Sequence, residues 1–415
     1  MPDSRDPMAP ASPAHPPTHL PGQAGARPLR PEPPVSVSRP LVTPIYPSVV
    51  YRSTDTEEID AQYEGRLEGY TYSREGHPNA TVLARAIDAL EGLDEAAGGG
   101  TITGSGMGAV AAILLGILKA GDHVVASDQL YGRTLRLMAR ELPRLGVTTT
   151  LVDTTNAGAV AAAMRPETRM IVVEVIANPT IRVADMEGIA AIAKARGALL
   201  VVDNTFTTPR GFPAFQRGAD IVFHSVTKLL SGHSDAMLGW AAARDPALNQ
   251  AIREAGETWG LTGAPFDCWL AERGLASFAL RHARAQENAG VLADRLAAEE
   301  AVEAVLYPGR PDHPDHNRAQ AVLDGQWGTM LSFRLAGGRE SVDRFLRAAD
   351  AIPFAPTLGD VATTLSHPVS SSHRAVSAEA RAAIGITDGF IRMSVGIDDA
   401  GAVGDALVAA IRRAG

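Results

Sequence analysis

The fold is decided by the stretch ALLVVDNTFTTPRGFPAFQRGADIVFHSVTKLLSGHSD (198–235), which contains two apolar runs. The first run ends at Asp203, and the second ends at Ser225 and leads to Lys228. Runs that are apolar throughout are typical of parallel strands covered on both faces. The carboxyl ends of such strands form the edge at which open α/β folds bind ligands. The stretch therefore predicts a parallel sheet that presents Asp203 and Lys228 at this edge.

The same alternation continues around this stretch. β-branched runs occupy 123–127, 148–153 and 169–175, with helical patterns at 107–119, 132–142, 157–164 and 186–196. This rhythm predicts an α/β fold whose large domain is a mostly parallel sheet with helices on both faces. After a helical stretch (275–300), separated strand patterns at 329–337 and 390–397 predict a smaller C-terminal α+β domain.

We divide the chain into four parts. Of the 28 prolines, 12 fall within residues 1–40, where large apolar side chains are scarce, so we expect a disordered tail there. Residues 41–79 are predicted to form an extended arm, 80–280 the large domain and 281–415 the smaller domain.

Composition excludes several classes of protein. The 415 residues are 45% hydrophobic and 20% charged with a net charge of −9, and no dense Lys/Arg run appears, so nucleic acid and membrane partners are not expected. The most apolar stretch, 108–121, is too short to span a bilayer. A single cysteine, Cys268, cannot form an intrachain disulfide or a thiolate cluster, and we expect it to be a packing residue in a cytoplasmic protein.

Metal binding is also not expected. His313 and His316 show H-x-x-H spacing, but prolines interrupt the helix that would align them. We predict a solvated loop there and no metal site.

A glycine-rich segment, TGSGMGA (103–109), precedes an apolar helix. Glycines at a helix N-terminus let backbone N–H groups approach an anion, and the helix dipole favours negative charge there. The spacing is G-x-G-x-G, so a dinucleotide site is not indicated, and a tight turn without a ligand is an equal alternative.

Asp203 and Lys228 add chemistry to this pattern. An acidic group at a strand end can pair with a protonated pyridine nitrogen, although it can also simply cap the next loop. Lys228 stands among apolar residues, where burial lowers the pKa of an amine and makes it a nucleophile. Ser225 and Thr227 could offer hydroxyls to a phosphate while Lys228 forms a Schiff base. Glycine loop, aspartate and lysine follow in the order expected for a pyridoxal phosphate site.

At this point the sequence resembles the fold-type I pyridoxal-phosphate enzymes of cysteine and methionine metabolism, the trans-sulfuration family. The resemblance runs from about Thr43 to Gly415. It rests on YTYSREGHPN, TGSGMGA, DQLYGRT, IANPTIRV, VVDNTFTTP, HSVTKLLSGHSD, PFDCWLAERGL, SHPVSSSH and IRMSVGIDD. It implies the α/β fold-type I transferase architecture and pyridoxal 5'-phosphate as cofactor.

The resemblance also implies roles for single residues. Lys228 would hold the cofactor covalently and Asp203 would pair with its ring nitrogen. The phosphate would be held by Gly106, Met107, Ser225 and Thr227, and by Tyr72 and Arg74 of a neighbouring subunit. Tyr131 would stack on the ring, Asn178 would contact the phenolic oxygen, and Arg392 would bind the substrate carboxylate, with Thr357 also on the substrate side. Outside the motif context, the arginines could be surface residues and Tyr131 a packing residue.

The implied activity is γ-elimination or γ-replacement on cystathionine or O-acyl-homoserine-type amino acids. Alternatives are an O-acetyl- or O-succinyl-homoserine sulfhydrylase, an aminotransferase of the same fold, and a catalytically silent binding protein. Ala362 stands where members acting on cystathionine often have a glutamate, and Arg133 where methionine γ-lyases typically have a cysteine. We therefore expect substrates shorter than cystathionine to be accepted. The partners implied are a small amino-acid substrate and a second subunit, in a homodimer with shared sites that pairs into a homotetramer.

Overall fold

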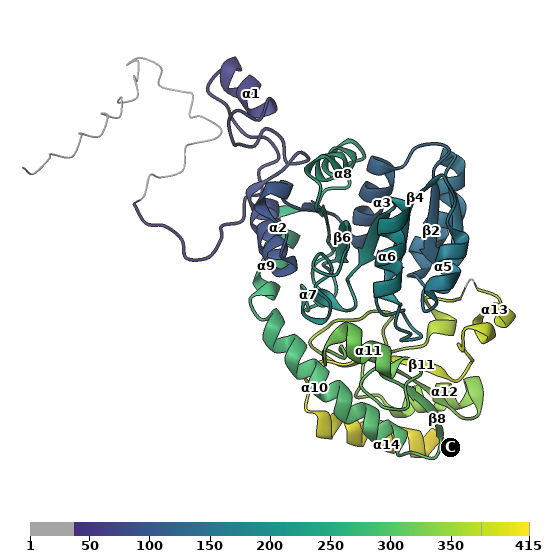
Figure 1. Cartoon of the computed structure of the whole chain (residues 1–415). Helices are drawn as coiled ribbons and strands as arrows, with labels where there is room; N and C mark the ends of the chain where they lie inside the picture. The colour runs from purple at the N-terminus through teal and green to yellow at the C-terminus, as the bar shows by residue number, and fades with distance from the viewer. Residues whose placement is uncertain (1–36, 375, 415) are drawn as a thin grey trace, which may run out of the picture. The chain divides into compact units, whose positions relative to one another are not determined.

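In the computed structural model of the protein, which describes residues 37–374 and 376–414, the apolar runs form a seven-stranded sheet (Figure 1). The strand order is β1-β7-β6-β5-β4-β2-β3. Neighbours from β3 to β6 pair in parallel, whereas β7 runs antiparallel to β6 and β1. The strands are β1 (Thr101–Thr103), β2 (His123–Ser127), β3 (Thr148–Val152), β4 (Thr168–Glu174), β5 (Leu199–Asp203), β6 (Ile221–Ser225) and β7 (Gly239–Ala243). The predicted mostly parallel sheet is confirmed.

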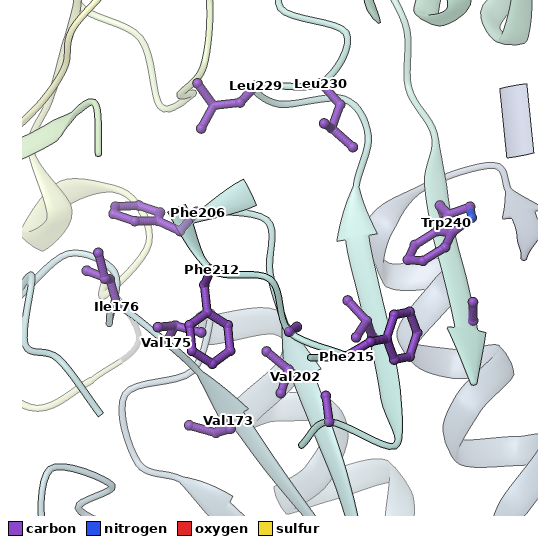
Figure 2. Close-up of a cluster of buried hydrophobic side chains, with 14 of the residues drawn as sticks. Val173, Val175, Ile176, Val202, Phe206, Phe212, Phe215, Leu229, Leu230 and Trp240 are labelled. Atoms are coloured by element: carbon purple, nitrogen blue, oxygen red, sulfur yellow. The ribbon is translucent and has the colours of Figure 1, made fainter. Parts of the chain in front are cut away.

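Different helices cover the two faces of this sheet. Alternate strand residues such as Val172 and Val201 pack with α3 and α8, and their neighbours Val173 and Val202 pack with α2, α6 and α9. Figure 2 shows part of this second core. The helices are α2 (Pro78–Glu91), α3 (Gly106–Ile117), α4 (Gly132–Arg136), α5 (Ala157–Ala163), α6 (Met186–Arg196), α7 (Thr208–Gly211), α8 (Pro246–Thr258) and α9 (Pro265–Leu275).

A second, antiparallel sheet of four strands follows in the order β10-β11-β9-β8. Its apolar face packs against α10, α12 and α14 through a core that includes Phe333 and Phe345. The elements are α10 (Phe278–Ala297), β8 (Val302–Leu306), α11 (His316–Leu323), β9 (Met330–Leu335), α12 (Gly338–Ala348), β10 (Thr364–Ser366), α13 (Ala378–Ala383), β11 (Phe390–Ser394) and α14 (Ala400–Ala414). The smaller α+β part of the predicted fold class is confirmed.

The helix predicted over 132–142 is interrupted. It begins as α4 and continues as a π-helical segment, Leu137–Glu141, which is followed by a 3-10 turn, Leu142–Leu145. Pro143 lies at the start of this turn. Proline has no N–H to continue the α-helical hydrogen bonds, so the regular helix cannot extend through it.

The N-terminal arm contains α1 (Thr56–Tyr63) and extended backbone, with an isolated bridge between Val50 and Tyr72. Among the described residues, those from Thr43 onward form one structural unit, to which the residues up to Val42 do not belong. The disorder predicted for residues 1–40 falls, up to residue 36, outside the described residues. The division at residue 280 stays a prediction, and it lies within the first turn of α10. None of the helices in the described part of the chain combines the length and apolar character needed to cross a membrane.

Candidate active site

Lys228 lies in the turn that follows β6. Its backbone N–H donates to the Ser225 carbonyl (3.1 Å), which fixes the start of the turn. The next two residues, Leu229 and Leu230, are buried members of the same hydrophobic core and lie on the loop beyond the end of the strand (Figure 2). Burial of the Lys228 amine, together with the positive charge of Arg392, lowers its pKa. The structure thus makes Lys228 a better nucleophile than a surface lysine.

The Lys228 turn is held from behind by Arg281 of α10. The buried guanidinium donates to the carbonyl oxygens of Leu229 (2.9 Å) and Gly274 (2.8 Å). Gly232, at the end of the turn, has φ +79°, and a Cβ there would lie 1.9 Å from Arg281 Nη1. Only glycine satisfies both conditions at this position. Sequence reasoning missed Arg281 because its ligands are backbone carbonyls, which leave no side-chain motif.

Asp203 is buried at the carboxyl end of β5. Its Oδ1 accepts a hydrogen bond from the Thr205 N–H (3.0 Å), and Thr205 Oγ1 accepts one from the Ser225 N–H (2.8 Å). These bonds join the ends of β5 and β6. Burial raises the pKa of Asp203, opposed by the Thr205 hydrogen bonds and by His224.

The glycine loop lies directly against β6. Ser105 caps α3, its Oγ accepting from the Gly108 N–H (3.0 Å). A Cβ on Gly106 would stand only 2.6 Å from the Ser225 Cβ, so the loop and the strand end approach as closely as their backbones allow. The start of a 12-residue helix and the Ser225 hydroxyl therefore face one another, as an anion site requires.

Two other predicted phosphate ligands make contacts of their own. The Thr227 hydroxyl donates to the Leu238 carbonyl (3.2 Å) and accepts from the Leu238 N–H (3.0 Å). The sulfur of Met107 accepts from the Thr134 hydroxyl at 3.7 Å. Both side chains bond to other protein groups in these contacts, so the contacts do not test a phosphate role. That role stays a prediction for Thr227 and Met107.

Arg392, on β11 of the small sheet, links the two sheets. Its guanidinium donates to the Oδ1 atom of Asn178 (2.9 Å) and to the Thr357 carbonyl (2.6 Å). Asn178 lies in the segment that follows β4. Burial lowers its pKa to about 10, while Tyr131 acts in the opposite direction. The buried Nε of Arg392 has no hydrogen-bond partner among the described residues. The structure thus brings together the predicted substrate-side residues Arg392 and Thr357 and the predicted cofactor ligand Asn178, and it leaves the Nε–H of Arg392 without a partner among the described residues.

Tyr131 lies at the start of α4 and is 41% exposed. Its backbone N–H donates to Glu174 Oε1 (2.6 Å), a residue that sequence reasoning missed. Glu174 is the last residue of β4 and is buried. The one signal for it was a charged residue inside an otherwise apolar run, IVVEV (171–175).

Tyr72 and Arg74 lie elsewhere. The Arg74 guanidinium stands over the Tyr72 ring at 5.4 Å, and it pairs with Glu75 at 3.5 Å. In the part of the chain that the structure describes, neither residue bonds to Lys228 or Asp203. Their predicted service to a neighbouring subunit is untested.

The H-x-x-H segment that contains His313 and His316 is not part of a metal site in the described residues. The described residues contain no group of three or more His, Cys, Asp or Glu side chains suited to a metal ion. The predicted solvated loop is wrong for His313, which is 3% exposed and whose pKa burial lowers to about 4. Its Nδ1 accepts from the Asp315 N–H, and Asp315 pairs with Arg182, which holds the loop against the segment between β4 and α6. Cys268 is buried, and burial raises the pKa of its thiol to about 12.

The residues fit pyridoxal phosphate. A lysine with a lowered pKa, a buried carboxyl that forms no ion pair with the described side chains, and a helix N-terminus packed on a serine match the aldehyde, the ring nitrogen and the phosphate of that cofactor. With the α/β fold, they define a pyridoxal-phosphate-dependent enzyme.

Comparison with known proteins identifies the family. The model of the Cys/Met metabolism PLP-dependent enzymes matches residues 32–412. The chain is 39% identical over 336 residues to a cystathionine gamma-lyase of Bacillus subtilis, covering 81% of this chain and 87% of that one. It is 38% identical over 362 residues to an L-methionine gamma-lyase of Fusobacterium nucleatum, covering 86% and 90%. A crystal structure of cystathionine gamma synthase from Xanthomonas oryzae, in complex with aminoacrylate and cysteine, matches with a TM-score of 0.84 at 36% identity, covering 90% and 93%.

The chain belongs to the pyridoxal-phosphate-dependent enzymes of cysteine and methionine metabolism. The expected family, fold class, cofactor and enzymatic nature are confirmed.

Proposed function

We propose that the protein catalyses elimination or replacement at Cγ of an α-amino acid whose side chain carries sulfur or an acylated oxygen. The observation that carries this proposal is the buried Arg392, whose Nε–H has no partner among the described residues and whose positive charge reaches the Lys228 amine. An α-amino acid offers a carboxylate that Arg392 would bind and an amine that would take the place of the Lys228 amine on the cofactor. The relatives named as lyases of methionine and cystathionine support the chemistry at the side chain.

Each residue has a distinct task in this proposal. When bound, pyridoxal phosphate supplies an electron sink for the carbanion formed at Cα. Lys228 holds the cofactor until substrate replaces it, and then moves protons at Cα and Cβ. Asp203 balances the charge of the protonated ring nitrogen. Arg392 binds the substrate carboxylate through its free donor, and Tyr131 gives a proton to the leaving group.

The remaining assignments concern binding. Gly106, Met107, Ser225 and Thr227 would hold the phosphate through backbone N–H groups and hydroxyls. Asn178 uses its Oδ1 for Arg392, which leaves its amide N–H₂ to donate to the phenolic oxygen of the cofactor.

We further propose that Tyr72 and Arg74 reach the phosphate in a partner subunit. Both side chains are exposed, and Arg74 pairs only with the neighbouring Glu75 among the described residues, so both are available to contact a partner subunit. The arm also exposes apolar side chains that a dimer would cover, namely Tyr46, Val49, Val50, Ile59 and Tyr63. We propose that two subunits form a homodimer with shared sites and that two such dimers form a tetramer. We place this assembly in the cytoplasm.

Substrate choice follows from two exchanged residues. Ala362 cannot pair with the distal ammonium of cystathionine, and exposed Arg133 adds a cation two residues from Tyr131. Specificity is a difference of affinities, so losing one attraction should flatten the preference toward shorter substrates or those with acidic leaving groups.

A substrate panel tests the proposal. The purified holoprotein is given L-cystathionine, O-acetyl- and O-succinyl-homoserine, methionine and cysteine, with and without sulfide or cysteine as acceptor. We expect a 2-oxo acid and ammonia from elimination, or a thioether from replacement. A preference for cystathionine above about a hundredfold, roughly 2.7 kcal/mol, would contradict the Ala362 argument. Amino-group exchange with 2-oxo acids as the sole reaction would replace the proposal with an aminotransferase.

A further inference from the structure

Glu174 places a second buried carboxyl beside Asp203. It ends β4 and is in register with Asp203, which ends β5. Register partners on neighbouring parallel strands project to the same face of the sheet, with their backbones about 4.8 Å apart. Glu174 is 6% exposed and Asp203 is 9% exposed. The two carboxyls therefore lie side by side at the edge that carries the site.

The Glu174 carboxyl attaches to this edge the turn at residues 128–131, which joins β2 to α4 and is called here the Tyr131 turn. Its Oε1 accepts the Tyr131 backbone N–H at 2.6 Å. Tyr131 is the N-cap of α4, and no side chain caps that helix. Hydrogen bonding from the backbone of Asn178 reaches the same carboxyl and, like that from Tyr131, lowers its pKa. One side chain thus connects two segments whose residues we place around the cofactor.

The charges of the pair determine its protonation. Burial, and next the negative charge of Asp203, raise the pKa of Glu174 well above its usual value, more than the two backbone hydrogen bonds lower it. In the described chain no Lys, Arg or His side chain forms an ion pair with either carboxyl. Two adjacent buried carboxyls do not both ionise. The charge of Asp203 raises the pKa of Glu174, whereas His224 lowers the pKa of Asp203, so the negative charge stays on Asp203.

We propose that Glu174 is a positioning residue of this active site: as a neutral carboxyl it holds the Tyr131 turn in place and leaves the negative charge to Asp203. The inference rests on the proposed roles of Tyr131 and Asp203. It assigns Glu174 no contact with substrate.

Two conservative variants of Glu174 distinguish the length of its side chain from its charge. Glu174→Gln keeps the acceptor oxygen at full length and is permanently neutral. Glu174→Asp keeps an ionisable group but withdraws it by about 1.5 Å, one C–C bond, from the Tyr131 N–H. The readout is the dissociation constant of pyridoxal phosphate, measured by its visible absorption after dialysis. We expect the Gln variant to bind pyridoxal phosphate within about twofold of wild type. The Asp variant should bind it about tenfold more weakly, because it loses the hydrogen bond to the Tyr131 N–H.

The reverse ranking, no change in either variant, or equal losses in both would overturn the inference. Asp153→Asn is the matched control, because Asp153 follows β3, is exposed and accepts from the Thr155 N–H just as Asp203 accepts from Thr205. Its cofactor affinity should equal that of wild type.

A double-mutant cycle with Tyr131→Ala isolates this inference from the proposed function. If Glu174 acts through the Tyr131 turn, the Asp substitution should add little in the Tyr131→Ala background. Full additivity overturns the role of Glu174 alone. Unchanged affinity in Tyr131→Ala itself overturns the proposed stacking of Tyr131, and with it the basis of the inference.

Discussion

Lys228 and Arg392 influence one another across two sheets, and this gives a pH-dependent prediction. The pKa of the Lys228 amine is lowered by burial and by Arg392 from an ordinary value of 10.5. Cofactor-free protein should therefore capture pyridoxal phosphate faster as pH rises, with a midpoint below that value, because the neutral amine is the nucleophile. Arg392→Met should move the midpoint upward.

The measurement is stopped-flow absorbance of the lysine-bound cofactor over a pH series. Lys228→Ala should show no such band and no turnover while its far-ultraviolet circular dichroism is unchanged. A midpoint at the ordinary lysine value in both wild type and Arg392→Met would refute the coupling.

Glu174 gives a second residue-scale prediction, on stability. A carboxyl whose pKa is raised on folding stabilises the protein fully below the ordinary glutamate pKa, and this contribution falls as pH rises through the raised value. The slope within that window is about 1.4 kcal/mol per pH unit. In cofactor-free protein, the wild type should lose stability relative to Glu174→Gln as pH increases. Urea denaturation at several pH values measures it, and a difference independent of pH would count against a protonated Glu174.

Some site residues could be predicted from sequence and others could not. Lys228, Asp203 and Gly106 stand in linear motifs whose order reflects the order of strands along the chain, so the fold brings them to one edge. Glu174 and Arg281 act on backbone groups of residues 131 and 229, which are distant in sequence. Their bonding depends on strand register and helix placement, which a single sequence does not display.

At the scale of elements, hydrogen bonds from Arg281 fix the Lys228 turn to α10. Arg281→Lys should lower the free energy of unfolding by about 2–3 kcal/mol, because lysine cannot reach several carbonyls as a guanidinium does. It should also weaken cofactor retention. Arg284→Lys, on the same helix but exposed, is the control and should change stability by less than about 0.5 kcal/mol. Chemical denaturation of the holoprotein decides; equal stability of the two variants would mean that Arg281 does not hold the turn.

The elements that sequence reasoning predicted well are the β-branched ones. Runs of apolar and β-branched residues such as HVVAS and LLVVD predict strands β2 to β6. Strand β7, GWAAA, has no β-branched residue and was not predicted, since it is a strand only through its pairing with β6 and β1. Tertiary pairing outweighs local propensity there.

For the whole molecule, the prediction concerns shared sites. If Arg74 serves the partner's phosphate, Arg74→Ala should weaken cofactor binding by about 1.5–3 kcal/mol. Mixing Arg74→Ala with Lys228→Ala subunits should then create one intact site in each hybrid dimer. Random reassociation of equal amounts should restore about a quarter of wild-type activity.

Activity assays after denaturation and joint refolding of the two variants measure this recovery. Separately refolded variants are the control. An active, cofactor-loaded monomer, or mixtures no more active than their parents, would show that each subunit is self-sufficient.

The bond between Arg392 and Asn178 has one further consequence. It ties β11 of the small sheet to the segment after β4 of the large one, next to the Lys228 amine. On the proposed assignment, a ligand must offer its carboxylate to one sheet and its amine to the other, across a single carbon atom. We therefore expect the site to accept α-amino acids of many side-chain lengths and to discriminate against simple amines and β-amino acids, whatever their side chains carry.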